Sequence, residues 1–291
     1  MSQLPQQIWN GLGVGSIYAL FALGYTLVFG VLDILNLAHA AIFMLGSMTS
    51  WWLVSAQGWP LWIALPVAVL VAGGLGVLLD RVAFLRLRQR GASHLSPLIS
   101  SIGMALVFVG LAKLLFGPER RQFPRDAFPQ QYYDLGTLRI SLLGIVILVV
   151  SLAMMAGLTW LVRRTSLGRS MRAVAENPRA AALLGVNIDG VIVQTFFIAS
   201  ALGGAAGVLY GLSQNSIEPT MGGQVELKGL AIIILGGMGS IPGAVIAGFV
   251  IGLVEVLSIA FGRSELKDAF VFAALFLVLL LRPEGIFAAK S

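Results

Sequence analysis

The segment from Ile8 to Leu32 reads IWNGLGVGSIYALFALGYTLVFGVL and contains no charged side chain. A helix that crosses the hydrocarbon core of a bilayer, about 30 Å thick, needs about 20 consecutive apolar residues. Ile8–Leu32 is long enough, and we expect it to cross a membrane as one helix. The chain continues in the same manner as far as Leu79: it holds no Lys or Arg up to that point, and Asp33 is its only acidic residue.

The composition of the whole chain agrees with this first segment. Hydrophobic residues make up 58% of the 291 residues and charged residues only 11%, whereas soluble domains carry about 25% charged residues. The net charge of +6 fits basic cytoplasmic loops better than nucleic-acid binding, because no base-stacking aromatic residues lie among the basic ones. The sequence has no cysteine, which excludes disulfides, thiol catalysis and cysteine-based metal sites.

The apolar segments predict an all-α, polytopic transmembrane helical bundle with about eight or nine spans. The segments are Ile8–Leu32, Leu37–Ser55, Leu61–Leu79, Leu95–Phe116, Ile140–Val162, Gly190–Leu212, Ile241–Phe261 and Leu266–Leu281. A shorter, glycine-interrupted segment near 226–240 predicts a broken or re-entrant half-helix of the kind that transporters place beside a cavity. Residues 1–291 then form a single transmembrane domain.

Basic residues predict which connections face the cytoplasm. The two arginine-rich connections hold Arg81, Arg86, Arg88 and Arg90, and Arg163, Arg164, Arg169, Arg172 and Arg179. The loops of mixed or acidic charge, which should face outward, are 117–139, 213–226 and 263–268. Counting spans from these loops places the N-terminus outside. The C-terminus, with Arg282 and Lys290, is cytoplasmic if Glu226–Gly237 also crosses the membrane, which gives nine spans. If this segment is re-entrant there are eight spans, and one of the two termini must then lie on the opposite side of the membrane.

The cytoplasmic loop 163–189 predicts two short amphipathic helices, Leu167–Glu176 and Pro178–Leu184. Ser166 can cap the first helix, since its hydroxyl accepts from a free N–H of the first turn. Asn177 and Pro178 suit the cap and first position of the second, and Gly185 can end it in a left-handed conformation. The apolar residues that need a surface to cover are Met171, Val174, Ala175, Ala181, Leu183 and Leu184. From the residues alone, this apolar face is equally suited to lie on the membrane interface and to dock onto a partner protein.

Most of this loop and four other blocks resemble the branched-chain amino-acid ABC transporter permease family of the LivH type. The blocks are Gly15–Leu20 with Ala22–Gly24, Asn36–His39 with Met44–Gly46, Gly168–Val186 (GRSMRAVAENPRAAALLGV), Leu235–Ala244 (LGGMGSIPGA) and Arg282–Phe287 (RPEGIF). Their order and spacing match the family along almost the whole chain. One position departs from the family: Ala40 stands where the family usually has Gly. Its methyl group leaves less room for another segment to approach the backbone at this point.

The resemblance implies a membrane-spanning permease subunit, with no enzyme activity of its own, in the cell inner membrane. It implies a second homologous permease as a heterodimer or homodimer, two ABC ATPase subunits and a periplasmic or extracellular solute-binding protein. The ATPases would bind a coupling loop that includes Gly168, Arg169, Arg172, Ala173, Glu176, Asn177, Pro178 and Gly185. The sequence holds no Gly-x-x-x-x-Gly-Lys-Ser/Thr phosphate loop, so partner subunits would use ATP and Mg and this chain would bind no cofactor.

Ionisable residues within the spans are candidates for the translocation pathway, because a charge at the bilayer centre costs at least about 2.5 kcal/mol. His39 and Glu255 are the ionisable candidates. Polar and glycine residues of the family motifs complete the predicted pathway set, which is Asn36, His39, Gly237, Gly239, Ser240 and Glu255. An interior hydrogen-bonded imidazole is the alternative for His39, and a position near the outer membrane face is the alternative for Glu255. Snorkelling or headgroup contact explains the charges near span ends: Asp80, Lys113, Glu226 and Lys228.

The resemblance implies import of branched-chain or other neutral amino acids by alternating access, and urea or short amides are alternatives within the same family. A stand-alone secondary transporter is a different class of function. Ion-coupled carriers place carboxylates or His at the membrane midplane, and in this sequence Glu255 is the only serious candidate for that position. A secondary transporter would also leave the Asn177-Pro178 loop without a role. An intramembrane enzyme is weaker still, because the spans hold no cluster of ligands or paired acids at catalytic spacing.

Overall fold

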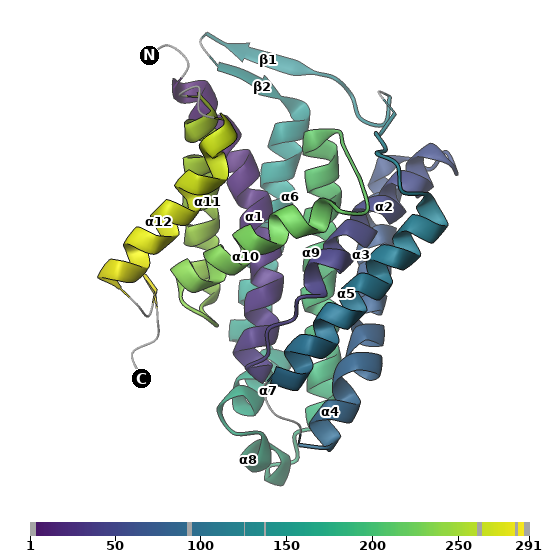
Figure 1. Ribbon diagram of the computed structural model, residues 1–291, viewed down its shortest axis with the longest axis vertical. Coiled ribbons are helices and arrows are strands. Elements are labelled where there is room, and N and C mark those ends of the chain that lie inside the picture. The colour runs from purple at the N-terminus through teal and green to yellow at the C-terminus, as the bar shows by residue number, and fades with distance from the viewer. Residues whose placement is uncertain are drawn as a thin grey trace.

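The computed structural model describes residues 4–91, 95–124, 126–136, 138–260, 264–282 and 285–287, and it confirms the all-α bundle (Figure 1). The helices are α1 Leu4–Leu32, α2 His39–Ser55, α3 Leu61–Leu79, α4 Leu85–Gln89, α5 Leu95–Phe116, α6 Leu142–Arg164, α7 Ser166–Glu176, α8 Pro178–Leu183, α9 Ile188–Gln214, α10 Met221–Gly236, α11 Ile241–Ala260 and α12 Lys267–Leu281. A hairpin of two strands, β1 Tyr132–Leu135 and β2 Leu138–Ser141, precedes α6.

Six helical segments in the described part of the chain are long and apolar enough to cross a membrane. They are α1, the continuous segment Leu61–Gln89 that includes α3 and α4, and α5, α6, α9 and α11. The other three predicted segments form shorter helices: α2 has 17 residues, α10 has 16 and α12 has 15. The predicted end of the seventh span at Phe261, like Pro283, Glu284 and Lys290, lies outside the described residues.

Figure 1 shows the β-hairpin at one end of the bundle, which we call the hairpin end, and α7 and α8 at the opposite, coupling end. Helix α1 begins at the hairpin end, where the Arg139 backbone N–H donates to Gln6 Oε1 at 2.7 Å. The connection from α9 to α10 also lies at the hairpin end, because Ile217 pairs with Arg121 through two backbone hydrogen bonds. Helix α10 then runs obliquely toward the coupling end, and α11 turns back (Figure 1).

The hairpin was not predicted from the sequence, and it corrects the start of the fifth span. Ile140 pairs with Tyr133 in the antiparallel ladder, so the helix begins at Leu142 rather than at Ile140. Ser141 caps it: the Gly144 N–H donates to Ser141 Oγ at 3.0 Å. A hydroxyl that accepts from the first turn satisfies a backbone donor that has no partner within the helix.

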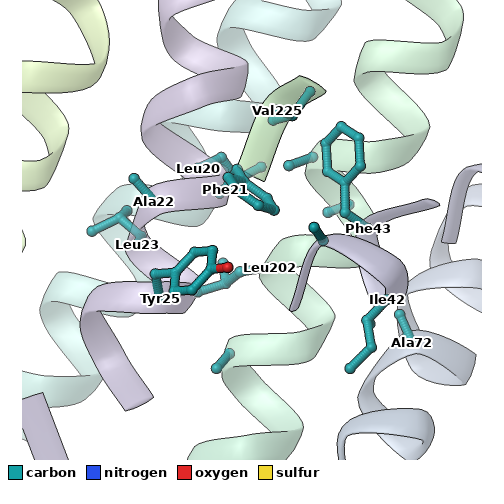
Figure 2. Packing of buried hydrophobic residues seen from close by; sticks show 14 of the residues in the cluster. Leu20, Phe21, Ala22, Leu23, Tyr25, Ile42, Phe43, Ala72, Leu202 and Val225 are labelled. Carbon is teal, nitrogen blue, oxygen red and sulfur yellow. The ribbon is translucent and has the colours of Figure 1, made fainter. Parts of the chain in front are cut away.

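The core lies where α1, α2 and α9 meet. The most apolar windows of α1 and α9 are 78% and 72% buried, whereas those of α5 and α6 are 17% and 22% buried. The outer helices therefore offer most of their apolar surface to lipid or to another protein. Figure 2 shows Phe21 and Tyr25 of α1, Phe43 of α2 and Val225 of α10 gathered around one space in the core. The Phe21 ring lies 5.4 Å from Tyr25 and 5.2 Å from Phe43, both edge-on.

Glycine lets α2 and α9 approach this closely. A Cβ added at Gly46 would lie 2.6 Å from the Cα of Gly204 on the facing helix, a distance at which the backbones would have to separate. Small residues at such positions are typical of membrane helix interfaces.

Asp80 lies inside the bundle and not at a headgroup position, which corrects the prediction for this residue. The helical segment Leu61–Gln89 contains one π-helical turn, Asp80–Phe84. The Asp80 side chain is fully buried, and both of its oxygens bind the guanidinium of Arg88. The helical segment continues past the apolar span to Gln89, so Arg88 on the same segment can reach the Asp80 carboxylate and neutralise its charge.

Candidate functional site

The loop at the coupling end forms two helices, as predicted, with one cap assigned to a different residue. Helix α7 begins at Ser166, so the cap is Thr165, whose Oγ1 accepts from the Gly168 N–H at 3.1 Å. Asn177 Oδ1 accepts from the Ala180 N–H at 3.0 Å, and Pro178 occupies the first position of α8. Gly185 has a φ of +82°, so the predicted left-handed end of this helix is confirmed.

The two coupling helices pack on the bundle and leave one apolar tip uncovered. Met171, Val174 and Ala181 face inward and are at most 2% exposed, whereas Leu183 is 90% exposed and Leu184 is 83% exposed. Isolated exposed leucines are common on proteins, but two consecutive ones at the tip of a six-residue helix make a small apolar knob.

Contacts with α6 hold the coupling helices in place. Arg172 donates a hydrogen bond to the Val162 carbonyl, although the arginine is otherwise exposed. A Cβ on Gly168 would overlap the carbonyls of Leu161 and Val162, so only glycine fits this junction. Among the remaining predicted coupling residues, Arg169, Glu176, Asn177, Pro178 and Gly185 are exposed and Ala173 is half-buried.

A cavity of about 960 Å³ opens between the coupling helices and the bundle. Ala175 and Pro178 line it from the loop, and Gly239 and Ser240 line it from the turn between α10 and α11. This turn requires glycine, because Gly237 and Gly239 have φ values of +91° and +82°. The coupling helices and the glycine turn therefore share one cavity, and a movement of one bears directly on the other.

Glu255 and Lys228 form a buried ion pair. Lys228 Nζ lies 2.6 Å from Glu255 Oε1, and each residue is 6% exposed. The same nitrogen lies 3.2 Å from Asp268 Oδ1 and donates to Tyr18 OH at 3.2 Å. The expectation that Lys228 snorkels at a span end is therefore wrong, since its charge is compensated inside the bundle. This network joins α1, α10, α11 and the start of α12.

His39 and Asn36 lie in the core. The His39 ring is 1% exposed, and its Nε2 donates to the Phe21 carbonyl at 3.2 Å. The Asn36 carbonyl accepts from the His39 N–H at 3.1 Å, where α2 begins. Gly203 leaves room for the ring, because a Cβ there would lie 2.6 Å from His39 Cε1. These contacts favour the interior, hydrogen-bonded interpretation of His39.

A mostly apolar groove of about 440 Å³ runs between α2, α5 and α10, and Glu226 is its one charged residue. Glu226 is half-buried, and Tyr25 OH donates from the core to its Oε1 at 3.3 Å. Ala40 also lines the groove, and its carbonyl lies so close to Gly222 that a Cβ there would overlap it. The close approach at Gly222 therefore involves the backbone of residue 40, whereas the methyl group of Ala40 makes only an ordinary contact there.

The predicted pathway residues do not form one site. Asn36 and His39 lie in the core, Gly239 and Ser240 at the coupling-end cavity, and Glu255 nearer the hairpin end. Sequence reasoning missed the partners of Glu255, although Lys228 in the middle of an apolar segment was a signal. A charge in such a place needs a counter-charge.

Comparison with known proteins gives consistent matches over nearly the whole chain. A family model described as branched-chain amino acid transport system / permease component matches residues 7–279. The chain is 38% identical to the high-affinity branched-chain amino acid transport system permease protein LivH of Escherichia coli K12, over 97% of this chain and 94% of that protein. It is 36% identical to BraD of Pseudomonas aeruginosa, with the same coverage.

Two more distant matches complete the comparison. The chain is 27% identical to the permease protein LivM of Escherichia coli K12, over 93% of this chain and 67% of that protein. Among solved structures, PsaBC from Streptococcus pneumoniae in complex with Fab matches with a TM-score of 0.51 and 12% identity, over 94% of this chain and 91% of that chain. This last likeness supports the fold alone.

Proposed function

This chain belongs to the branched-chain amino acid transport system permease component family, and on this premise we propose that it is the membrane-spanning subunit of an ATP-driven importer. Its substrates are branched-chain or other neutral amino acids, and it works in the inner membrane. The observation that carries the proposal is the 38% identity to LivH along 97% of the chain. The relatives are branched-chain amino acid permeases, which favours amino acids over urea or short amides.

The coupling end supports a division of labour with separate ATPases. The Leu183–Leu184 knob is exposed at the end of the helix that Asn177 and Pro178 begin, and it offers an apolar anchor to a partner. Closure of two ATPases would push α7 and α8, which are fixed to α6 through Arg172 and Val162. The same movement would change the cavity that Gly239 and Ser240 line. ATP and Mg belong to the ATPase subunits.

A second homologous permease completes the pathway in this proposal. The weakly buried α5 and the groove between α2, α5 and α10 give it an apolar contact surface with one carboxylate, Glu226. Asn36 and His39 support the pathway from the bundle core, where the His39 imidazole is buried and hydrogen-bonded. Gly237, Gly239 and Ser240 form its cytoplasmic exit. The hairpin end, with the N-terminus, faces outward to the solute-binding protein, and the C-terminus is cytoplasmic.

A proton-coupled carrier is the competing class, and the Lys228–Glu255 pair argues against it. A carboxylate 2.6 Å from a buried ammonium is already engaged in an ion pair inside the bundle, so it is not the free carboxylate that such a carrier places on its ion pathway. The glycine turn and the coupling helices also have no role in that class of carrier.

Affinity purification tests the proposal. The tagged chain is expressed in its native host and purified in mild detergent, and its partners are identified by mass spectrometry and reconstituted in liposomes. We expect two ATPases with phosphate loops, a second permease, and leucine uptake that requires ATP and the solute-binding protein. Recovery of this chain alone, with uptake that needs no ATP, would refute the proposal in favour of the carrier.

A further inference from the structure

The hairpin end holds a small cavity of about 280 Å³ between α1, α9, α10 and α11. Pockets for drug-sized ligands are larger, about 300–1,000 Å³, so this one suits a smaller molecule. Two basic residues, Arg120 and Lys267, and two acidic residues, Glu218 and Glu255, bring charges of both signs to its wall. Val14, Val256 and Ile259 give it an aliphatic side.

Glu255 lines this cavity, and one of its carboxylate oxygens is an acceptor that the described residues do not use. Its Oε1 binds Lys228, whereas its Oε2 is buried and has no hydrogen-bond partner within the described part of the chain. Lys228 has no donor to spare, because Glu255, Asp268 and Tyr18 surround its ammonium group. A buried acceptor without a partner is unfavourable, so a donor supplied by a ligand would be favourable there.

We infer that this cavity is an entry site for one zwitterionic, aliphatic amino acid. The α-ammonium group donates to Glu255 Oε2, the α-carboxylate lies toward Arg120, and the side chain packs on Val256 and Ile259. Arg120 is anchored at the rim by its hydrogen bond to Ser216 Oγ, which leaves its terminal nitrogens for a carboxylate. The inference rests on the proposed function and adds a place in this subunit where the substrate is held.

The chemistry of the wall distinguishes this ligand from others. The described residues contain no group of three His, Cys, Asp or Glu side chains that could hold a metal ion. A neutral amide would leave both charged ends of the cavity without a counter-charge. An amino acid supplies an ammonium and a carboxylate together with an apolar side chain, and all three have a complementary wall.

Substrate protection of a single cysteine tests the site, because the chain has no cysteine of its own. Gln224→Cys places a thiol on the cavity wall, and Asp134→Cys on β1 is the control. Both are made in the complete permease–ATPase complex without the solute-binding protein, and labelling with a membrane-impermeant maleimide is timed. We expect L-leucine and L-valine to slow labelling of Gln224→Cys several-fold and to leave Asp134→Cys unchanged, while urea protects neither.

Filling the cavity gives an independent measurement. Ile259 and Ile246 lie on α11 and are each 43% exposed, but only Ile259 lines the cavity. We expect Ile259→Trp to lower ATP-dependent leucine uptake several-fold with unchanged subunit composition, and Ile246→Trp to transport as the unmodified complex does.

The outcomes separate the site from the function. Leucine import by the unmodified complex, with no leucine protection of Gln224→Cys and normal uptake by Ile259→Trp, would overturn the site and leave the function standing. Protection by the solute-binding protein alone, but not by free leucine, would also overturn it and mark the cavity as a docking surface. Failure of the unmodified complex to import any neutral amino acid would remove the proposed function and this inference together.

Discussion

At the scale of single residues, Lys228 makes the most consequential contact, because its ammonium compensates a carboxylate that has little access to water. Lys228→Ala leaves Glu255 buried without its cation, and breaking one side of a buried pair costs about 3–5 kcal/mol. We expect a clear loss of thermal stability in detergent, measured by size-exclusion chromatography after heating. Asp268→Asn is the matched control: Asp268 is 55% exposed, and exposed pairs contribute about 0–1 kcal/mol. Equal stability of the two variants would contradict the pairing.

Gly203 and His39 give a second prediction at the same scale. Gly203→Ala places a methyl group 2.6 Å from His39 Cε1, and overpacking of this kind costs about 1–3 kcal/mol. Gly110→Ala on α5 meets open space, and alanine in a helix interior is favoured over glycine by about 0.5–1 kcal/mol. The two variants should therefore shift the apparent melting temperature in opposite directions. A Gly203→Ala protein as stable as Gly110→Ala would show that the ring lies elsewhere.

At the scale of elements, the coupling helices have two separate parts. Arg172 on α7 attaches them to α6, and the exposed Leu183–Leu184 knob is the part proposed to dock onto the ATPase. Leu183→Glu with Leu184→Glu alters side chains that are 90% and 83% exposed, so the fold should be unchanged. Loss of an apolar interface anchor costs about 2 kcal/mol or more, roughly a thirtyfold weaker complex, and we expect the ATPases to be lost on purification together with ATP-dependent uptake.

Arg172→Glu with Ala173→Glu should have the same effect on the ATPases and should in addition loosen α7, because the hydrogen bond to Val162 is removed. Limited proteolysis within the coupling loop distinguishes the two double variants: only the second should be cleaved faster than the unmodified chain. If the ATPases co-purify and uptake persists with both, the loop is not the coupling element.

The type and ends of a helix could be predicted from the sequence where a single local pattern determines them. The apolar spans follow from composition, and the Asn177-Pro178 and Gly185 signals gave both ends of α8. The hairpin was missed because Ile140 continues an apolar run, and only its pairing with Tyr133 shows that it belongs to a strand. The ion-pair network was missed for a similar reason: Lys228 and Tyr18 are 210 positions apart, and no local pattern connects them.

At the scale of the whole molecule, the two ends of the bundle differ in what they present. The hairpin end offers a cavity with charges of both signs, and the coupling end offers an apolar knob beside a larger cavity. The α10 helix connects the two, since Lys228 lies in the network beside the first cavity and the turn after Gly236 lines the second. A transporter that admits substrate at one end and receives force at the other needs such a connection.

The orientation of the molecule in the membrane gives the last prediction. Basic loops face the cytoplasm, so the loop with Arg169 and Arg179 should lie inside and the hairpin outside. Asp134→Cys should react with a membrane-impermeant maleimide in intact cells. Arg179→Cys, equally exposed on α8, should react only after the membrane is permeabilised. Because α1 begins beside the hairpin, the same pattern places the N-terminus outside. The reverse pattern of labelling would place the coupling helices outside the cell, away from cytoplasmic ATP, and would contradict their docking to the ATPases.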